Sequence, residues 1–534
     1  MQMKRIMCLL AALALLASAA GAETKEQDAE SVVGSVVFHE GWDTQDNHRV
    51  FYEIFVGSFS DSDGDGTGDL RGIINRMDYL NDGDPASGRS LGVEGIWLTP
   101  VFLSPSYHKY DVSDYYTIDP AFGTTEDLKE LISLCHDRGV RLILDLPLNH
   151  TGAEHPWYRK FLEAHRKGNP ADRYYNYYVW YPAGEPLPAA GRFMQAAEGL
   201  MVEANFSDRM PELNFDDPLV RKAVLDIGKY YLEMGVDGFR FDAAKYPYYG
   251  DHEKNAAFWG WYTGELKKIR PDVYTVAEVW DPDEVTIRYA GSVDCFRFST
   301  SQAEGLIAYT ARGGNVNRFT ADTERYLGMI GAARPDAQNV FFIANHDTDR
   351  AAGYLTIASG RMAVAANLYL LAPGSPFIYY GEEIGLRGSR GAAETDANRR
   401  LGMRWGDGDT VRDPEGSDYG AQTEATVADM ARDPDSLLNY YRKLLMIRKA
   451  NPEIARGTYR ALSFPDSKAG GFLSTWKGNT VAVMHNTGKR KVTLNVAEAA
   501  GRPFEQVAAV IGAGGATLEN GVLTLDAQTS AVLR

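Results

Sequence analysis

Short apolar runs alternate with longer amphipathic segments from residue 51 onward. This alternation is typical of βα units that build a parallel sheet with helices on its outer face. Eight such runs predict an α/β fold in which the sheet closes into a (β/α)8 TIM barrel. The predicted strands are Phe51–Val56, Val93–Leu98, Val140–Leu146, Val236–Phe241, Val273–Ala277, Val293–Phe298, Val340–Ala344 and Pro376–Tyr379.

Two of the connecting helices can be predicted in detail. Asp217 and Pro218 supply an N-cap and a proline at the first helical position, and apolar residues then recur on one face. Gly235 ends this helix directly before the next strand. A second helix, Glu126 to Arg138, ends in the same way at Gly139. Such short connections are expected at the bottom of a βα barrel, the end that contributes only to stability.

The same pattern predicts parts outside the barrel. Roughly seventy residues follow the third strand, too many for an ordinary connection, so residues 150–215 are predicted to form a small inserted domain. After about residue 455 short alternating runs separated by Gly- and Asn-containing turns predict a C-terminal antiparallel β-sandwich over 455–534. The barrel would then cover 46–149 and 216–454, after a loosely ordered lead-in over 23–45.

The N-terminus has the pattern of a secretory signal peptide. Lys4 and Arg5 precede an apolar stretch, and small residues ending at Ala22 follow it. We therefore expect residues 1–22 to be removed and the mature protein to be exported, either periplasmic or extracellular. No later apolar run approaches the length of about 18 residues that a membrane span needs, so we expect no membrane insertion after cleavage.

Composition and charge narrow the class of partner. The 534 residues are 44% hydrophobic and 24% charged, which is typical of a globular enzyme and excludes a disordered or collagen-like chain. Asp and Glu total 72 against 55 Lys and Arg, so the formal net charge is −17. A negative surface repels phosphate backbones and anionic lipid. We expect a neutral substrate, no nucleic-acid partner, and a monomer.

Three carboxylates stand where predicted barrel strands end. Asp242 follows Gly238–Phe241, Glu278 follows the run that ends at Ala277, and Asp347 comes soon after the seventh run. Working residues of a TIM barrel come from these strand ends. A pair of carboxylates, one a nucleophile and one a proton donor, is what glycoside hydrolysis requires. Each acid alone would more often cap a helix or pair with an arginine, but three together favour catalysis.

An acidic loop follows the first predicted strand. Asp61-Ser-Asp-Gly-Asp-Gly-Thr-Gly-Asp69 places oxygens at every second position, and its glycines allow the backbone to curl. Such oxygens suit a hard cation, and calcium (Ca2+) is the natural occupant. An EF-hand would need Glu at the twelfth position, which is Gly72, so that type of site is excluded. The alternative is an acidic turn without a metal.

Several segments resemble the motifs of glycoside hydrolase family 13, the α-amylase family, in the same order and spacing. The similarity extends over nearly the whole mature length. The segments are Asp145-Leu-Pro-Leu-Asn-His150, Gly238-Phe-Arg-Phe-Asp-Ala-Ala-Lys245, Ala277-Glu-Val-Trp280, Asn345-His-Asp347, Met210-Pro-Glu-Leu-Asn214 and Ser104-Pro-Ser-Tyr-His-Lys-Tyr-Asp-Val112.

The resemblance implies a role for each carboxylate. Asp242 would be the nucleophile that forms a covalent β-glucosyl intermediate, Glu278 the general acid and base, and Asp347 the transition-state stabiliser. The configuration at the sugar C1 would then be retained. Arg240, two residues before Asp242 on one strand, points to the same side and is expected to pair with that carboxylate.

The resemblance also implies contacts to the sugar. His150 and His346 would hydrogen-bond glucose hydroxyls, Tyr110 would stack beneath the ring, and Asp111 in the same loop would contribute to substrate binding. Lys245 would serve a flanking subsite. Aromatic side chains of the inserted region suit either flanking subsites or core packing; they are Trp157, Tyr158, Tyr174, Tyr175, Tyr177, Tyr178, Trp180 and Tyr181.

For the acidic loop the resemblance implies a ligand set. The side chains of Asp61, Asp63, Asp65 and Asp69 and the carbonyl of Thr67 would bind calcium, as in one branch of the family. Many α-amylases have His after the Lys of the Asp242 motif, where this chain has Tyr246. This departure argues against the family's other calcium site, between barrel and inserted domain.

The motifs favour α-1,4-glucans such as starch, glycogen or maltooligosaccharides as substrates. Ala243 and Ala277–Trp280 resemble α-1,4-acting amylases, whereas Met210-Pro211 is similar to subgroups intermediate between oligo-1,6-glucosidases and neopullulanases. The alternative functions that remain are an exo-acting α-glucosidase, an oligo-1,6-glucosidase or a transglycosylase that acts on short oligosaccharides. A non-catalytic relative, such as the heavy chains of amino-acid transporters, is the alternative of another class, although all three acids are present.

Overall fold

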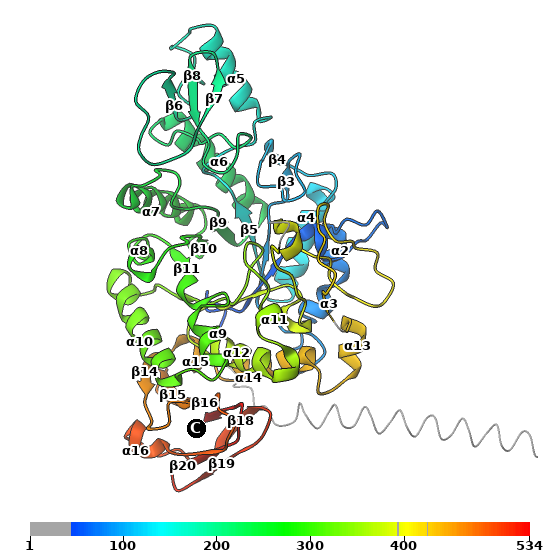
Figure 1. Cartoon of the computed structure of the whole chain (residues 1–534), viewed down its shortest axis with the longest axis vertical. Helices are drawn as coiled ribbons and strands as arrows, with labels where there is room; N and C mark the ends of the chain where they lie inside the picture. The colour runs from blue at the N-terminus through cyan, green and yellow to red at the C-terminus, as the bar shows by residue number, and fades with distance from the viewer. Residues whose placement is uncertain (1–43, 392–394, 424) are drawn as a thin grey trace, which may run out of the picture.

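The computed structural model describes residues 44–391, 395–423 and 425–534. The predicted signal peptide, residues 1–22, and all but the last two residues of the predicted lead-in lie outside the described residues. A central barrel separates two smaller regions, with residues 150–215 at one end of the long axis and the C-terminal domain at the other (Figure 1). In the part of the chain that is described, no helix combines the length and the apolar character that crossing a bilayer requires.

The barrel wall is an eight-stranded parallel sheet in the order β12-β11-β10-β9-β5-β2-β1-β13. A hydrogen bond of 2.8 Å from the Phe377 amide to the Phe341 carbonyl closes it between the two outermost strands. The predicted TIM barrel is therefore confirmed, with shorter strands than expected. They are β1 (Phe51–Ile54), β2 (Gly95–Leu98), β5 (Arg141–Leu146), β9 (Gly238–Phe241), β10 (Tyr274–Ala277), β11 (Asp294–Phe296), β12 (Asn339–Val340) and β13 (Phe377–Tyr379).

Aromatic rings fill the barrel interior near the start of the strands. Phe51 stacks on Tyr274 at 4.6 Å and on Phe377 at 4.7 Å between ring centroids. Gly95 and Gly238 occur at the neighbouring interior positions, where a Cβ would lie 2.3 Å from the Phe51 ring and 1.9 Å from the Tyr274 carbonyl. Only glycine fits beside these groups, so the first residues of β2 and β9 are determined by interior packing.

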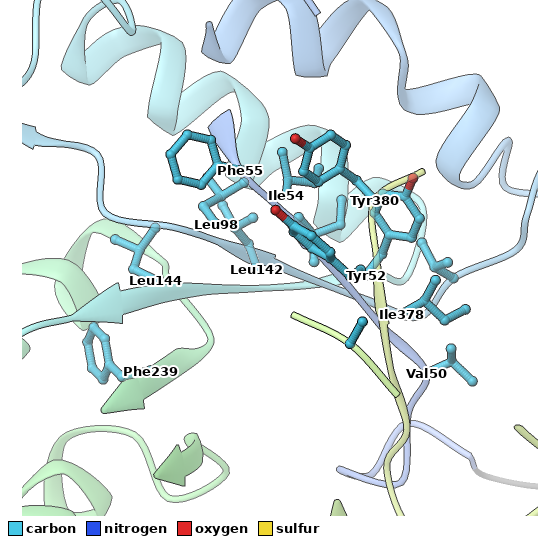
Figure 2. Close-up of a cluster of buried hydrophobic side chains, with 14 of the residues drawn as sticks. Val50, Tyr52, Ile54, Phe55, Leu98, Leu142, Leu144, Phe239, Ile378 and Tyr380 are labelled. Atoms are coloured by element: carbon cyan, nitrogen blue, oxygen red, sulfur yellow. The ribbon is translucent and has the colours of Figure 1, made fainter. Parts of the chain in front are cut away.

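The opposite faces of the strands pack against the surrounding helices. Figure 2 shows Tyr52 and Ile54 of β1 in one buried cluster with Leu98, Leu142 and Leu144 of the neighbouring strands. Side chains alternate between the interior and this layer, because successive residues of a strand point to opposite faces. The main covering helices are α2 (Leu70–Asn75), α4 (Thr125–Asp137), α6 (Pro218–Met234), α7 (His252–Ile269), α9 (Leu306–Ala311), α10 (Val316–Ala333), α12 (Arg361–Leu370) and α14 (Leu437–Ala450).

Shorter elements complete the barrel loops. Helix α6 begins and ends as predicted, with the Asp217 carboxylate accepting the Leu219 amide and Gly235 in the left-handed conformation at φ 117°. Helix α4 has a Thr124 capping box. The remaining elements are β3 (Phe102–Leu103), β4 (Asp114–Ile118), α3 (Met77–Leu80), α8 (Asp283–Thr286), α11 (Ala351–Tyr354), α13 (Val427–Arg432), α15 (Glu453–Arg456) and the 3-10 turns η1 (Val56–Ser58), η2 (Phe298–Thr300), η3 (Ile357–Ser359), η4 (Glu382–Ile384) and η5 (Asp396–Arg399).

Residues 150–215 contain one helix and a small sheet. Helix α5 (Pro156–Arg166) lies beside an antiparallel sheet of β6 (Trp180–Pro182), β8 (Leu200–Glu203) and β7 (Phe193–Ala197). The aromatic residues of this region pack largely on one another: Tyr158 contacts Tyr178 at 5.0 Å and Trp157 contacts Tyr177 at 5.5 Å between centroids. Tyr158, Tyr177 and Tyr178 are buried and belong to the core of this region, whereas Trp157, Tyr174, Tyr175, Trp180 and Tyr181 are half-buried.

The C-terminal domain consists of two antiparallel sheets that share one core. Leu473 and Met484 of the first sheet pack with Leu494 and Leu523 of the second, as in the predicted sandwich. The first contains β14 (Thr458–Leu462), β15 (Ala469–Trp476), β16 (Asn479–Asn486), β21 (Thr529–Leu533) and β18 (Val507–Gly512), and the second β17 (Val492–Asn495), β20 (Val522–Leu525) and β19 (Ala516–Glu519). A short helix, α16 (Val496–Ala500), also occurs where only strands were expected.

A buried carboxylic acid behind the last barrel strand links stability to pH. The side chain of Glu382 accepts hydrogen bonds from the hydroxyls of Tyr369 at 2.5 Å and Tyr441 at 2.7 Å. Burial, together with the neighbouring Glu383, outweighs these bonds and raises the pKa of Glu382 to about 7. The folded protein therefore keeps this acid protonated up to a higher pH than the unfolded chain does.

We predict that Glu382→Gln stabilises the protein increasingly as the pH rises from 5 to 8. A raised pKa contributes stability below the ordinary value of 4.5, and this contribution is lost as the pH passes through about 7. The full effect is about 3 kcal/mol. Melting temperatures of the variant and wild type across this range test it, with exposed Glu505→Gln as control. A constant difference between variant and wild type would contradict the prediction.

Candidate active site

Polar side chains replace the aromatic ones at the carboxyl ends of the strands. Glu53, Asp145 and Arg240 each follow an interior residue by two positions, so all three point into the barrel mouth. Strand register places Asp145 beside Arg240. All three side chains are nearly fully buried, and a buried charge has to be paired. The side chains at the base of the barrel mouth therefore form a network of paired charges, directly above the aromatic layer of the barrel interior.

Arg240 is the centre of this network. Its Nη1 donates to both oxygens of Asp145 at 2.9 and 3.0 Å and to Asp242 at 2.6 Å, and its Nη2 donates to Glu278. The guanidinium also lies 5.1 Å from the centroid of the Trp97 ring. Burial alone would lower the pKa of Arg240, but the carboxylates, Asp145 foremost, raise it well above its ordinary value. A permanent cation thus holds Asp242 and Glu278 together.

The backbone also links the two strand ends that carry these acids. The Glu278 amide donates to the Phe241 carbonyl and the Ala244 amide donates to the Glu278 carbonyl, both at 2.9 Å. Between these bonds Ala243 has a positive φ of 45°, a conformation that a residue with a Cβ seldom adopts. The chain therefore turns sharply directly after Asp242, which leaves that carboxylate at the end of β9.

The third acid belongs to a second, connected group. His346 contacts the carboxylates of Glu53 at 2.6 Å and Asp347 at 2.9 Å through its two ring nitrogens. Burial would lower the pKa of His346, but these two carboxylates outweigh burial and raise the pKa to about 9. Arg400 donates to Asp347 at 2.8 Å. Burial would raise the pKa of Asp347, but His346 and Arg400 lower it, so Asp347 is ionised.

Tyr110 joins the two groups. Its hydroxyl lies 2.8 Å from Asp145 and 2.7 Å from His346 Nε2, and its ring stacks on the His346 ring at 5.5 Å. His150 lies next to it, with Nε2 3.1 Å from the Tyr110 carbonyl. Burial lowers the pKa of His150, so this imidazole is neutral. Both residues line the same barrel mouth as the carboxylates.

Two residues predicted to bind substrate contact other groups. Asp111 accepts hydrogen bonds from Ser104 at 2.7 Å and from Ser106, and therefore shapes its own loop. Lys245 donates to the Trp280 carbonyl at 2.9 Å and to Asp281 at 2.7 Å. Lys245 thus orients the loop that follows Glu278.

Sequence reasoning missed four members of the network. Asp145 begins a family-like motif but ends an otherwise apolar run, Glu53 lies inside an apolar run, and Trp97 resembles any core aromatic. Polar residues in the middle of apolar strand runs were the available signal for Glu53 and Asp145. Arg400 comes from a loop far along the chain, and no local pattern marks it.

The acidic loop brings together three of its predicted ligands. Carboxylate oxygens of Asp61, Asp63 and Asp65 all lie within 4.8 Å of one another. Two oxygens that bind one calcium ion at about 2.4 Å are at most about 4.8 Å apart, so this cluster has the size and the hard donors that calcium needs.

The other two predicted ligands are placed differently. Asp69 caps helix α2, accepting the Gly72 amide at 2.6 Å and the Ser62 amide at 2.9 Å. Thr67 donates its amide to Asp65 at 2.6 Å. A distant segment covers the loop, since the Thr410 hydroxyl donates to Asp61 at 2.6 Å.

Comparison with known proteins agrees with this geometry. The family model described as "Alpha amylase, catalytic domain" matches residues 53–457. Alpha-amylase 3 of Dictyoglomus thermophilum is 34% identical over 459 residues, which cover 84% of this chain and 86% of the relative. Further relatives are named cyclomaltodextrinase, 4-alpha-glucanotransferase and oligo-1,6-glucosidase.

Solved structures show the same architecture. Amy13B of Eubacterium rectale superimposes with a TM-score of 0.86 at 31% identity, covering 94% of this chain and 98% of that one. An α-amylase from H. orenii has a TM-score of 0.78 at 35% identity, covering 91% and 99%. The range of named relatives is consistent with an intermediate branch. The chain therefore belongs to glycoside hydrolase family 13, the α-amylase family, and is an α-amylase-like glycosidase.

Proposed function

We propose that this protein hydrolyses α-1,4-glucosidic bonds in starch, glycogen or maltooligosaccharides with retention of configuration. The observation that carries the proposal is the pairing of Asp242 and Glu278 with neighbouring nitrogens of one buried guanidinium. Retaining glycosidases need two carboxyl groups about 5 Å apart. Acids held on one arginine suit that spacing, whereas an inverting enzyme needs a wider gap for water.

Each carboxylate then has a defined part in a double displacement. Asp242 attacks C1 of the glucose unit and forms a covalent ester while Glu278 gives its proton to the departing glycosidic oxygen. Glu278 next removes a proton from water, which attacks C1 and releases Asp242. Asp347, kept ionised by Arg400 and His346, stabilises the positive charge that develops at C1.

The ion pair with Arg240 sets a condition on the first step. Glu278 contacts the Arg240 guanidinium directly, and a carboxyl group that delivers a proton has to leave this contact. Sugar hydroxyls that enter the mouth compete for the same donors. Arg240 keeps Asp145 and Asp242 as partners when Glu278 turns away, so the nucleophile stays oriented throughout.

Hydrolysis of α-1,4 bonds is favoured over the other activities of the relatives. The loop after Asp242 begins with Ala243, and Trp280 follows Glu278, both as in the α-1,4-acting members that this chain resembles. An exo-acting α-glucosidase, an oligo-1,6-glucosidase or a transglycosylase is the second candidate, since relatives of the chain are named 4-alpha-glucanotransferase and oligo-1,6-glucosidase.

We predict that Asp242→Asn lowers kcat on maltoheptaose by at least about 1,000-fold, because the covalent intermediate cannot form. The melting temperature should change little, since the amide oxygen still accepts from Arg240. Asp226→Asn, an exposed carboxylate on α6, is the matched control and should keep normal turnover. Activity of the Asp242 variant near that of the control would refute the role of the nucleophile.

The position of cleavage separates the two candidate activities. An endo-acting amylase is predicted to release internal fragments from maltoheptaoside blocked at its non-reducing end, because the barrel mouth would accept the middle of a chain. Product analysis by chromatography, with the unblocked sugar as control, reads this out directly. Cleavage of only the unblocked sugar would favour the α-glucosidase.

We further propose that the side chains of Asp61, Asp63, Asp65 and Asp69 and the carbonyl of Thr67 bind Ca2+. The spacing of the three carboxylates supports the site. The loop joins β1 to α2, and its cover by Thr410 ties this part of the chain to a late barrel loop. Calcium would supply structural stability there.

We predict that calcium raises the melting temperature of the wild type and that EDTA removes the increase. Binding to the folded state alone stabilises it by about 2.7 kcal/mol at a calcium concentration 100 times Kd. Asp63→Asn should abolish this response, while exposed Asp78→Asn should keep it. Melting curves that are the same with calcium and with EDTA would rule out the site.

We also propose that the protein is exported after removal of residues 1–22 and acts as a monomer. The charged, apolar and small-residue regions between Lys4 and Ala22 support export. In the periplasm or outside the cell the enzyme would encounter glucans that come from the surroundings.

A further inference from the structure

A groove lies beside the loop that carries Glu278. It has a volume of about 340 Å³, and its walls come from α8, η2, α9 and α10. Helix α8 follows β10, and η2 follows β11 (Figure 1). The groove therefore opens near the carboxyl ends of two barrel strands, on the same side of the barrel as the candidate active site. None of the residues assigned to the reaction lines it.

Tyr309 forms an exposed platform in this groove. Its side chain is 46% exposed, although it belongs to helix α9. A Cβ at Gly314 would lie 2.6 Å from Cε1 of the Tyr309 ring, so the glycine backbone packs directly against the ring. The Arg318 guanidinium lies 5.7 Å from the ring centroid. The backbone thus fixes the ring in place, and a substantial part of it faces solvent.

The polar groups of the groove fall into two sets. Asp283 is held by Arg297 at 2.7 Å and by Arg325 at 2.8 Å, which makes the floor rigid. In contrast, the carboxylates of Glu284 and Glu304 have neither an ion pair nor a side-chain hydrogen bond to any residue that the structure describes. A fixed aromatic ring with unpaired hydrogen-bonding groups around it suits a sugar, whose apolar face stacks while its hydroxyls are bonded.

An exposed aromatic residue links the groove to the catalytic loop. Trp280, two residues after Glu278, is 39% exposed and stacks on Phe298 at 4.7 Å and 16°. Pro282 and Ser299, which lie one or two positions beyond this pair, line the groove. The groove therefore adjoins the loops that carry Trp280 and Phe298, the first of which also carries Glu278.

We propose that this groove is a second binding site for α-glucan chains, used by polymers and not by short oligosaccharides. The inference rests on the proposed function, since it takes the same substrate class. The occupant is a neutral α-glucan, because the rim carries side chains of both charges, Glu284 and Glu304 against Arg318, around one open ring. Holding a polymer here would raise its local concentration at the barrel mouth.

The test compares Tyr309→Ala with Tyr116→Ala, a control of similar exposure at 41% that contacts Tyr230 at 5.2 Å on another part of the surface. Both changes are made in the Asp242→Asn background, and the Kd for glycogen is measured by affinity electrophoresis. Tyr309→Ala should weaken Kd about tenfold, which equals about 1.4 kcal/mol, while Tyr116→Ala leaves it unchanged. Tyr309→Phe, which keeps the ring, should bind as the parent does.

With Asp242 restored, Tyr309→Ala should cleave a blocked maltotrioside with kcat/KM within twofold of wild type. If Tyr309→Ala binds glycogen as tightly as Tyr116→Ala does, the proposed groove is wrong. If Tyr309→Ala loses as much kcat/KM on the short substrate as it loses affinity for glycogen, Tyr309 belongs to the active site and the proposed groove is again wrong. Wild type that cleaves no α-glucan overturns the proposed function itself. Wild type that cleaves α-glucans with Tyr309→Ala binding normally overturns only the groove.

Discussion

The whole active site depends on one buried ion cluster, in which the Arg240 guanidinium pairs with Asp145, Asp242 and Glu278. Removing a charge from water is costly, and a buried ion that loses its partner destabilises a protein by about 3–5 kcal/mol. The three acids and the arginine therefore constrain one another to a single arrangement. The same cluster holds Asp242 and Glu278 on neighbouring nitrogens of one guanidinium, so the interaction that is hardest to bury also fixes the relative positions of these two acids.

The barrel meets this constraint by dividing its interior into two layers. The lower layer is aromatic, with Phe51, Tyr274 and Phe377 packed where Gly95 and Gly238 leave room. The upper layer, two residues further along each strand, is ionic. Because the lower layer excludes water from below, the charges above it interact strongly with each other. The mouth stays open to a substrate that carries no charge and so does not disturb the balance.

Loops far apart in the sequence complete the structure around this mouth. Arg400 holds Asp347, Thr410 holds the acidic loop after β1, and Arg76 of that region pairs with Asp409 at 2.9 Å. The late loops thus connect the proposed calcium site and Asp347 to the same part of the chain. Trp280, in the loop after β10, and Tyr309, on helix α9, leave aromatic surface exposed.

By itself the sequence determined the eight strands, the cap of α6 at Asp217 and the strand-end positions of Asp242 and Glu278, because period-two alternation and capping are local properties. The folded chain was needed to show that Glu53 and Arg400 join the site, that Asp69 caps α2, and that Tyr158, Tyr177 and Tyr178 are buried together. The partners of these charges lie outside the local segment: His346 is 293 residues from Glu53, and Asp347 is 53 residues from Arg400. The desolvation of a charge or a ring is settled only when such partners meet.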